Sequence, residues 1–382
     1  MVGVGNKVGV AIIAIVLLVS AGIFLGVNSN ALFAQEKQDT IKIGWISDLS
    51  GSGAKYGAYE AGLLAVEEIN AKGGINGKKI ELIVEDGKCN SKTAVDAMNK
   101  LVNIDKVKFV LGGHCSPETI AIAPLAEENK VIVLASISTS PVITSLGDYV
   151  FRTSPVSVIQ SDLLANLAVT KLKKKKVAII YSQTDYAKPI AEKMKERFPI
   201  EGGQVVLYEG FLQNSTDFRS ILAKVQASGA DLLFLSPQNS DEALNLLKQV
   251  KELNIQTQIF GNDQLYNVKV FGENRLNEGV IIGAPEYSKE NALTKKFTDA
   301  FVAKYKSEPP FGIWTAESYD GVYLLAEGIS KYGEDTDKVK EFIYSVKDWE
   351  GASGKITIDK NGDGVREYSL KLVKNGLLVG LD

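Results

Sequence analysis

The sequence predicts an α/β protein made of two doubly wound lobes that several chain crossings join. Short apolar segments typical of strands alternate with amphipathic segments typical of helices from residue 41 onward, and the alternation restarts after residue 153. Strands separated by helices form a parallel sheet with helices on both faces. The length of 382 residues also exceeds what one core usually holds, so two lobes are expected.

The first half of the chain provides the elements of the first lobe. The strands expected there are 41–47, 79–86, 108–113 and 131–136, and the helices are 56–70, 92–103 and 117–128. In the second lobe, strands are expected at 176–182, 204–210, 231–236 and 258–261, with helices at 160–171, 187–198, 218–228 and 241–253. Two short α/β units of this kind each have their own core.

The last hundred residues are expected to return to both lobes. Helices predicted at 292–305 and 314–331 have no strands of their own to cover, so we assign them to the first lobe, and 355–373 resembles a hairpin closing with a last strand. The predicted lobes are 40–157 with 286–352, and 158–285 with 353–382. Several crossings between lobes form a hinge, and the cleft between the lobes is the default ligand site.

The N-terminus carries an export signal. Lys7 precedes an apolar run from Val8 to Val27, which is long enough to cross a bilayer as a helix. We expect residues 1–39 to form a signal or membrane anchor plus linker, with cleavage near Ala34 as one outcome and retention of the anchor as the other. The protein is therefore expected to be periplasmic or on the cell surface.

Composition argues against several classes of function. A net charge of −3 gives no reason to expect nucleic acid as a partner. The chain has a single histidine, His114, which disfavours a Ser-His-Asp hydrolase and a His-rich metal site. His114 itself is interpreted as a loop histidine that could also touch a ligand. We expect neither an enzyme nor a cofactor.

Two motifs resemble known sites but depart from them. Gly51, Gly53 and Gly57 have the spacing GxGxxxG where a dinucleotide fingerprint needs GxGxxG, so a tight turn near a ligand is favoured. The segment from Asp359 to Gly364 matches the start of a calcium loop, but its twelfth position is Leu370 where the loop needs a glutamate. A polar turn between strands is favoured there.

The cysteines, Cys89 and Cys115, each follow a predicted strand. An exported chain meets an oxidising compartment, where a disulfide persists. If the two strands are neighbours in the sheet, their ends lie close enough for a bridge. A disulfide and a pair of free buried thiols are both open at this point.

Polar residues also follow several predicted strands. Ser116 with Pro117, and Thr139 with Ser140 and Pro141, each resemble a helix start at the carboxyl end of a strand. Open α/β sheets bind ligands at that edge, and helix N-termini there suit a carboxylate. Ordinary capping is the alternative. In the second lobe, Asp263 follows a strand and could hold an ammonium group, with a loop or capping role as its alternative.

The chain resembles the periplasmic branched-chain amino-acid-binding proteins, the type I solute-binding components of ABC importers. The motifs that carry the resemblance are IKIGWISDLSGSGAKYG, AVEEINAKGGINGKKIELIVEDGKCN, KFVLGGHCS, FRTSP and TDFRSIL, and it extends from about residue 41 to the end. The resemblance implies a type I periplasmic-binding-protein fold and a bridge between Cys89 and Cys115.

The resemblance also implies an amino-acid site. Ser116 and Thr139 would bind the carboxylate, while the Ile137 carbonyl and Asp263 would bind the ammonium, although leucine-binding members have Glu in place of this Asp. The implied side-chain walls are Tyr56, Tyr186, Gln238, Asn239 and Trp314, with Phe311 in place of Trp314 if a gap is moved. Gln238 and Asn239 replace a Tyr of the leucine-binding members, which puts branched-chain selectivity in doubt.

These observations predict a solute-binding protein that closes on an amino acid and delivers it to an ABC permease. We expect a monomer. The alternatives are a binder of amides, urea or small carboxylic acids in the same family, a ligand-sensing receptor ectodomain, and a dinucleotide-dependent enzyme.

Overall fold

The computed structural model describes residues 39–266 and 275–381, and the predicted signal segment lies outside them. Within the described residues, no helix combines the length and apolar content that crossing a bilayer requires. The described residues from Ile41 onward form one compact unit.

The first lobe is built on a sheet in the order β2-β1-β3-β4-β5. Its strands are β1 (Thr40–Ser47), β2 (Lys79–Asp86), β3 (Phe109–Leu111), β4 (Ile132–Ala135) and β5 (Val150–Arg152). The first-half helical segments are η1 (Ser52–Tyr56), α2 (Ala58–Ala71), α3 (Ser91–Asn103), α4 (Ser116–Asn129) and η2 (Pro141–Ser145). The predicted elements agree with these bounds to within a few residues, but β5 and η1 were not predicted.

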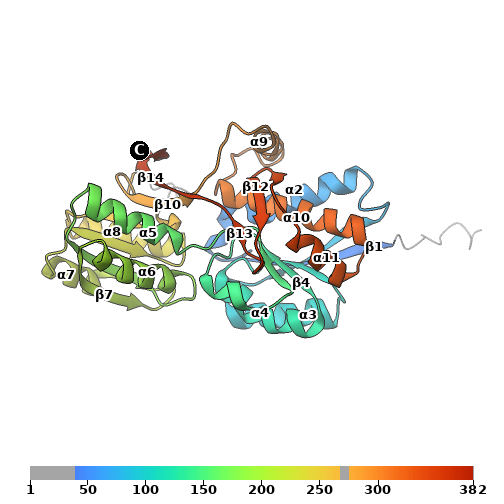
Figure 1. Cartoon of the computed structure of the whole chain (residues 1–382), viewed down its shortest axis with the longest axis horizontal. Coiled ribbons are helices and arrows are strands. Elements are labelled where there is room, and N and C mark those ends of the chain that lie inside the picture. Colours follow the sequence, from blue (N-terminus) through green and yellow to red (C-terminus); the bar gives the residue numbers. More distant parts are fainter. Residues whose placement is uncertain (1–38, 267–274, 382) are drawn as a thin grey trace, which may run out of the picture. The chain divides into compact units, whose positions relative to one another are not determined.

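Helices cover both faces of this sheet (Figure 1). On one face, α2 packs with helices from late in the chain, α9 (Ala292–Tyr305), α10 (Ile313–Tyr332) and α11 (Thr336–Tyr344). On the other face lie α3 and α4. Gly62 of α2 makes room for the Trp45 indole, because a Cβ there would lie 1.7 Å from the ring. The predicted return of the late helices to the first lobe is confirmed.

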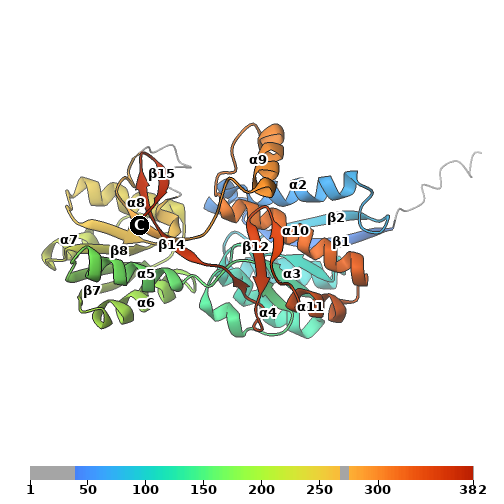
Figure 2. The ribbon, with the colours of Figure 1, turned by 45° about the horizontal axis from the view of Figure 1, so that its top comes forward.

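The second lobe is built on a sheet in the order β15-β14-β10-β9-β8-β6-β7. Its strands are β6 (Lys176–Ser182), β7 (Gln204–Phe211), β8 (Leu232–Ser236), β9 (Gln258–Gly261), β10 (Ile281–Pro285), β14 (Tyr368–Lys374) and β15 (Leu377–Gly380). Its helical segments are α5 (Ile159–Asn166), η3 (Leu167–Lys171), α6 (Ala187–Ile200), α7 (Arg219–Ala227), α8 (Ser240–Glu252) and η4 (Asp263–Leu265). Figure 2 shows this arrangement from a second side. The α/β fold of two doubly wound lobes is as predicted.

The C-terminal segment differs from the single hairpin predicted for it. The first part forms β11 (Trp349–Gly351), β12 (Gly354–Ile358) and β13 (Gly364–Val365), and Ile356 and Ile358 pack in the first lobe's core. Only β14 and β15 join the second sheet, where β14 runs antiparallel to β10. Alternating strand residues predict pairing but not which sheet provides the partner. The lobe boundaries as a whole stay a prediction.

The chain passes between the lobes after β5, after β10 and after β13. Arg152, at the first crossing, is fully buried and donates from Nε to Asp363 Oδ1 at 2.7 Å. Its guanidinium also donates to the Ser140 carbonyl and to Thr144 Oγ1. A buried cation with several partners fixes the first crossing against the third.

Candidate functional site

The first lobe presents two chain segments that follow adjacent strands, β3 and β4. Cys115, not Ser116, is the N-cap of α4, and the Glu118 side chain caps back onto the Cys115 backbone. Ser116 was predicted to be the N-cap, but it is the first residue inside the helix. The segment after Thr139 is a short 3₁₀ turn capped by Ser140, not a full helix, so its dipole is small.

The Ser116 hydroxyl joins these two segments. Its oxygen accepts hydrogen bonds from the backbone N–H groups of Thr139 and Ser140, both at 3.2 Å. Because the oxygen already accepts two hydrogen bonds, the hydroxyl proton points elsewhere. The Ser116 O–H and the nearby N–H groups together form a set of donors suited to an anion.

The second lobe presents a carboxylate to the same space. Asp263, two residues after the end of β9, accepts a hydrogen bond from the Tyr186 hydroxyl at 2.5 Å. Burial raises the pKa of Asp263 above its ordinary value, and the nearby Tyr186 and Trp314 side chains oppose that shift. Burial and the adjacent Asp263 charge raise the pKa of Tyr186, so Tyr186 remains a donor.

Both sets of groups line one cavity of about 40 Å³ between the lobes. Every predicted ligand-binding residue lies on its wall. These are Tyr56, Ser116, Ile137, Thr139, Tyr186, Gln238, Asn239, Asp263 and Trp314. Phe311, the alternative to Trp314, lies outside this cavity and stacks on Tyr56 with ring centroids 4.2 Å apart. Sequence reasoning missed the remaining side chains on the wall, which include Asp48 and Gln264, and it favoured a loop role for His114.

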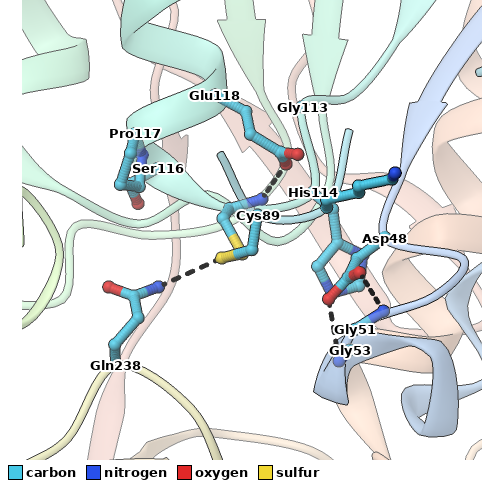
Figure 3. The surroundings of a disulfide bond; sticks show 12 residues. Asp48, Gly51, Gly53, Cys89, Gly113, His114, Ser116, Pro117, Glu118 and Gln238 are labelled. Atoms are coloured by element: carbon cyan, nitrogen blue, oxygen red, sulfur yellow. Dashed lines mark hydrogen bonds between the residues drawn. A yellow bond between two sulfur atoms is a disulfide. The ribbon is translucent and has the colours of Figure 1, made fainter. Parts of the chain in front are cut away.

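Asp48 and His114 could have been found from position alone. Asp48 follows β1 and His114 follows β3, so both stand at the same carboxyl edge as Ser116. Asp48 accepts from the N–H groups of Gly51 and Gly53 at 2.8 and 2.9 Å, which shapes the turn after β1 (Figure 3). Burial lowers the pKa of His114 despite the Asp48 charge, so the imidazole is neutral at pH 7.

The Tyr56 hydroxyl connects the lobes. It donates to Gln264 Oε1 at 2.8 Å, lies 2.7 Å from Ser240 Oγ, and accepts from the Ser240 backbone N–H at 3.1 Å. Gln264 and Ser240 belong to the second lobe, whereas Tyr56 belongs to the first. The hydroxyl therefore links the two lobes beside the cavity that Tyr56 lines.

Replacing Tyr56 with Phe should weaken ligand binding about tenfold. Each lost hydrogen bond contributes about 0.5–1.5 kcal/mol, and a less populated closed state lowers the apparent affinity. Calorimetry on the variant measures this loss. Tyr59→Phe is the matched control, since the Tyr59 ring packs against Trp45 within the first lobe. Equal affinities for Tyr56→Phe and the wild type would show that the hydroxyl does not stabilise closure.

The structure joins Cys89 and Cys115 in a disulfide, with Cα atoms 5.2 Å apart. The reason given from the sequence was wrong, because β2 and β3 are not neighbours and β1 lies between them. The bridge forms because the loops after β2 and β3 reach across the end of β1. Gln238 Nε2 lies 3.6 Å from Cys89 Sγ (Figure 3), so the disulfide also contacts the second lobe.

The side chains of Gln238 and Asn239 also make hydrogen bonds within the second lobe. Gln238 Oε1 accepts from Thr184 Oγ1 at 2.6 Å, and Asn239 Oδ1 caps α8 by accepting from the Glu242 N–H at 2.9 Å. Their amide groups nevertheless line the cavity, so this wall is polar where the leucine-binding pattern has an aromatic ring.

The glycine motif after β1 and the segment that resembles a calcium loop both form turns. Gly51 and Gly53 wrap around Asp48, and Asp359 Oδ1 accepts from the N–H groups of Asn361 and Asp363. The Asp363 carboxylate forms an ion pair with Arg152. Over residues 39–266 and 275–381, no group of His, Cys, Asp and Glu side chains could hold a metal ion.

Comparison with known proteins agrees with this geometry. A curated relative, the leucine-, isoleucine-, valine-, threonine- and alanine-binding protein of Pseudomonas aeruginosa, is 30% identical over 85% of this chain and 87% of its own. A branched-chain amino acid transporter substrate-binding protein from Streptococcus pneumoniae, solved with isoleucine, has a TM-score of 0.80 at 30% identity, covering 89% of this chain and 98% of that one.

A second solved structure holds a different ligand. It is a solute-binding protein of an ABC transporter from Rhodopseudomonas palustris in complex with 3,4-dihydroxybenzoic acid, with a TM-score of 0.77 at 25% identity, covering 90% of this chain and 96% of that one. The family model described as periplasmic binding protein matches residues 40–376. The chain therefore belongs to the periplasmic binding protein family.

Proposed function

We propose that the protein is an extracytoplasmic receptor that binds a small α-amino acid between its lobes and delivers it to an ABC importer. The carrying observation is the placement of Asp263 on one lobe opposite the donor set of Ser116 and Thr139 on the other, around one cavity. A zwitterion satisfies both sides at once and so favours the closed state over the open one.

The carboxylate end is assigned to the first lobe. The Ser116 hydroxyl has a proton left to donate, and the N–H groups of Thr139 and Ser140 lie beside it. A bound carboxylate could take hydrogen bonds from all of these donors, each strengthened by its charge. The start of α4, whose dipole is positive at this end, favours the same anion.

The ammonium end is assigned to Asp263. A carboxylate accepts several hydrogen bonds, so Asp263 can keep the Tyr186 hydroxyl as a donor and also pair with an ammonium. The Ile137 carbonyl, which lines the same cavity, would be a second acceptor for the ammonium. The bound cation would also lower the pKa of Asp263 and keep the carboxylate ionised.

The size and polarity of the cavity favour a short side chain. A cavity of about 40 Å³ holds roughly three or four waters at about 10–15 Å³ each. Gln238, Asn239, Gln264 and His114 supply amide and imidazole groups to its wall. Alanine, serine and threonine fit these conditions better than leucine or isoleucine. The Pseudomonas relative is named as binding threonine and alanine as well as the branched-chain amino acids.

The remaining roles follow from this proposal. Residues 1–39 would act as the export signal or membrane anchor, and the closed monomer would be recognised by a membrane permease. We also propose that the protein holds its ligand without catalysing a reaction on it, in line with its membership of the periplasmic binding protein family.

Thermal-shift screening tests the proposal. Alanine, serine, threonine, leucine, urea, acetamide and 3,4-dihydroxybenzoate would each be added to the purified protein. A ligand at a hundred times its dissociation constant stabilises the folded state by about 2.7 kcal/mol, which raises the melting temperature measurably. Stabilisation by a small amino acid supports the proposal. Stabilisation by the aromatic acid alone would instead favour the rival, a carboxylic-acid binder, to which the Rhodopseudomonas neighbour points.

A further inference from the structure

A second and larger cavity adjoins the proposed amino-acid site. Its volume is about 420 Å³, compared with about 40 Å³ for the first. The two cavities share Asp263 and Trp314 as wall residues. Asp263 and Trp314 therefore stand between the two cavities.

The second cavity has mostly apolar walls. They come from β10, the connection to α9, α9 itself, the start of α10 and the β14–β15 hairpin; Figure 2 shows β15 and α9 on the same side of the molecule. Representative wall residues are Ala284, Tyr287, Thr298, Phe311, Ile313 and Leu378. Charged side chains of both signs, Lys289, Lys371 and Glu308, also line it, and Lys371 pairs with Glu286 at 3.6 Å. The walls suit an apolar group and show no excess of one charge that would require an ion.

The position of this cavity indicates which end of the ligand could carry a group that reaches into it. It touches Asp263, the partner proposed for the ammonium, whereas Ser116, Thr139, Gln238 and Asn239 line only the first cavity. A group that projects from the carboxylate or the α-carbon would meet those first-cavity residues. A group attached to the amino nitrogen would meet Trp314 and the second cavity behind it.

We propose that the site also accepts α-amino acids that carry an apolar substituent on the amino nitrogen, with the substituent in the second cavity. This inference rests on the proposed function. A secondary amine stays protonated and keeps the ion pair with Asp263, whereas the N–H of a peptide bond is neutral and would leave the buried carboxylate without a cation. The substituent would pass beside Asp263 and Trp314 and bury apolar surface in the second cavity.

Calorimetry with L-alanine and N-benzyl-L-alanine tests the proposal. The wild type should bind the benzyl compound at least as tightly as alanine. Thr298 lines the second cavity only, so Thr298→Phe should weaken the benzyl compound about tenfold or more and change alanine binding by less than about twofold. Ala303→Phe is the matched control, because Ala303 is an exposed residue of the same helix, α9. The control should bind both compounds like the wild type.

Ala284→Phe, which fills the cavity from β10, gives an independent second variant if Thr298→Phe fails to fold. Alanine binding without N-benzyl-L-alanine binding would overturn the inference and leave the proposed function intact. An equal loss of affinity for both compounds in Thr298→Phe and Ala284→Phe would also overturn it, because the second cavity would then not hold the benzyl group specifically. Failure of alanine and of every other amino acid to bind the wild type would overturn the proposed function, and this inference with it.

Discussion

Asp263→Asn should weaken binding of the best amino-acid ligand by about thirtyfold or more. Removing one member of a buried, hydrogen-bonded charge pair costs about 2–5 kcal/mol, and 1.4 kcal/mol corresponds to tenfold in affinity. Asn keeps the size of the side chain and can still accept from Tyr186, so the loss reports the charge. Calorimetry on the wild type and the variant measures it.

The pH dependence of binding provides the control for this variant. Because burial raises the pKa of Asp263, its carboxylate takes up a proton at a higher pH than an ordinary aspartate does. Affinity of the wild type should therefore be fully present at high pH and fall as the pH drops through that raised pKa. The Asn variant should show no such fall over the same range. An Asn variant that binds as tightly as the wild type would contradict the ammonium assignment and favour a ligand without an amino group.

Ser116→Ala should cause a smaller loss than Asp263→Asn. The N–H groups of Thr139 and Ser140, which Ser116 Oγ engages in the structure, would remain available to the ligand carboxylate. A loss of about tenfold or less is expected from removing one charge-assisted donor. The same calorimetric series measures it, and a loss larger than that of Asp263→Asn would show that the hydroxyl, and not the set of backbone donors, holds the carboxylate.

Replacing both Cys89 and Cys115 with Ser should lower the free energy of unfolding by about 3.5 kcal/mol, the loop-entropy value for a separation of 26 residues. The cysteines belong to two loops that cross the end of β1, so the unfolded chain gains the freedom that the bridge removed. Denaturant unfolding followed by circular dichroism measures the change. Ligand affinity should fall as well, because the Cys89 backbone and sulfur contact Gln213 and Gln238 of the second lobe.

Wild-type protein unfolded under reducing conditions is the control, and its midpoint should approach that of the double variant. Thiol titration of denatured, unreduced wild type should find no free thiols. Two free thiols, or equal unfolding midpoints for the oxidised wild type and the double variant, would contradict a stabilising bridge.

The sequence by itself determined the architecture and much of the site. The alternation of apolar strands with amphipathic helices predicted both lobes, because each period buries one kind of surface. Residues that follow parallel strands lie at the carboxyl edge of their own sheet, so Ser116 and Thr139 in the first lobe and Asp263 in the second could be proposed before any geometry was known. Asp48 and His114 also follow strands of the first sheet, so the same argument would have placed them at the site.

Only the tertiary structure decided which groups meet and which atoms remain available. Strand order put β1 between β2 and β3, and it placed β12 in the first lobe while sending β14 to the second sheet. The packing of the two lobes made the Tyr56 hydroxyl a contact between them and formed the cavity beside Trp314. These outcomes depend on contacts between residues far apart in the chain. Local periodicity shows which surface of a helix or strand is buried, but it does not show which other element covers that surface.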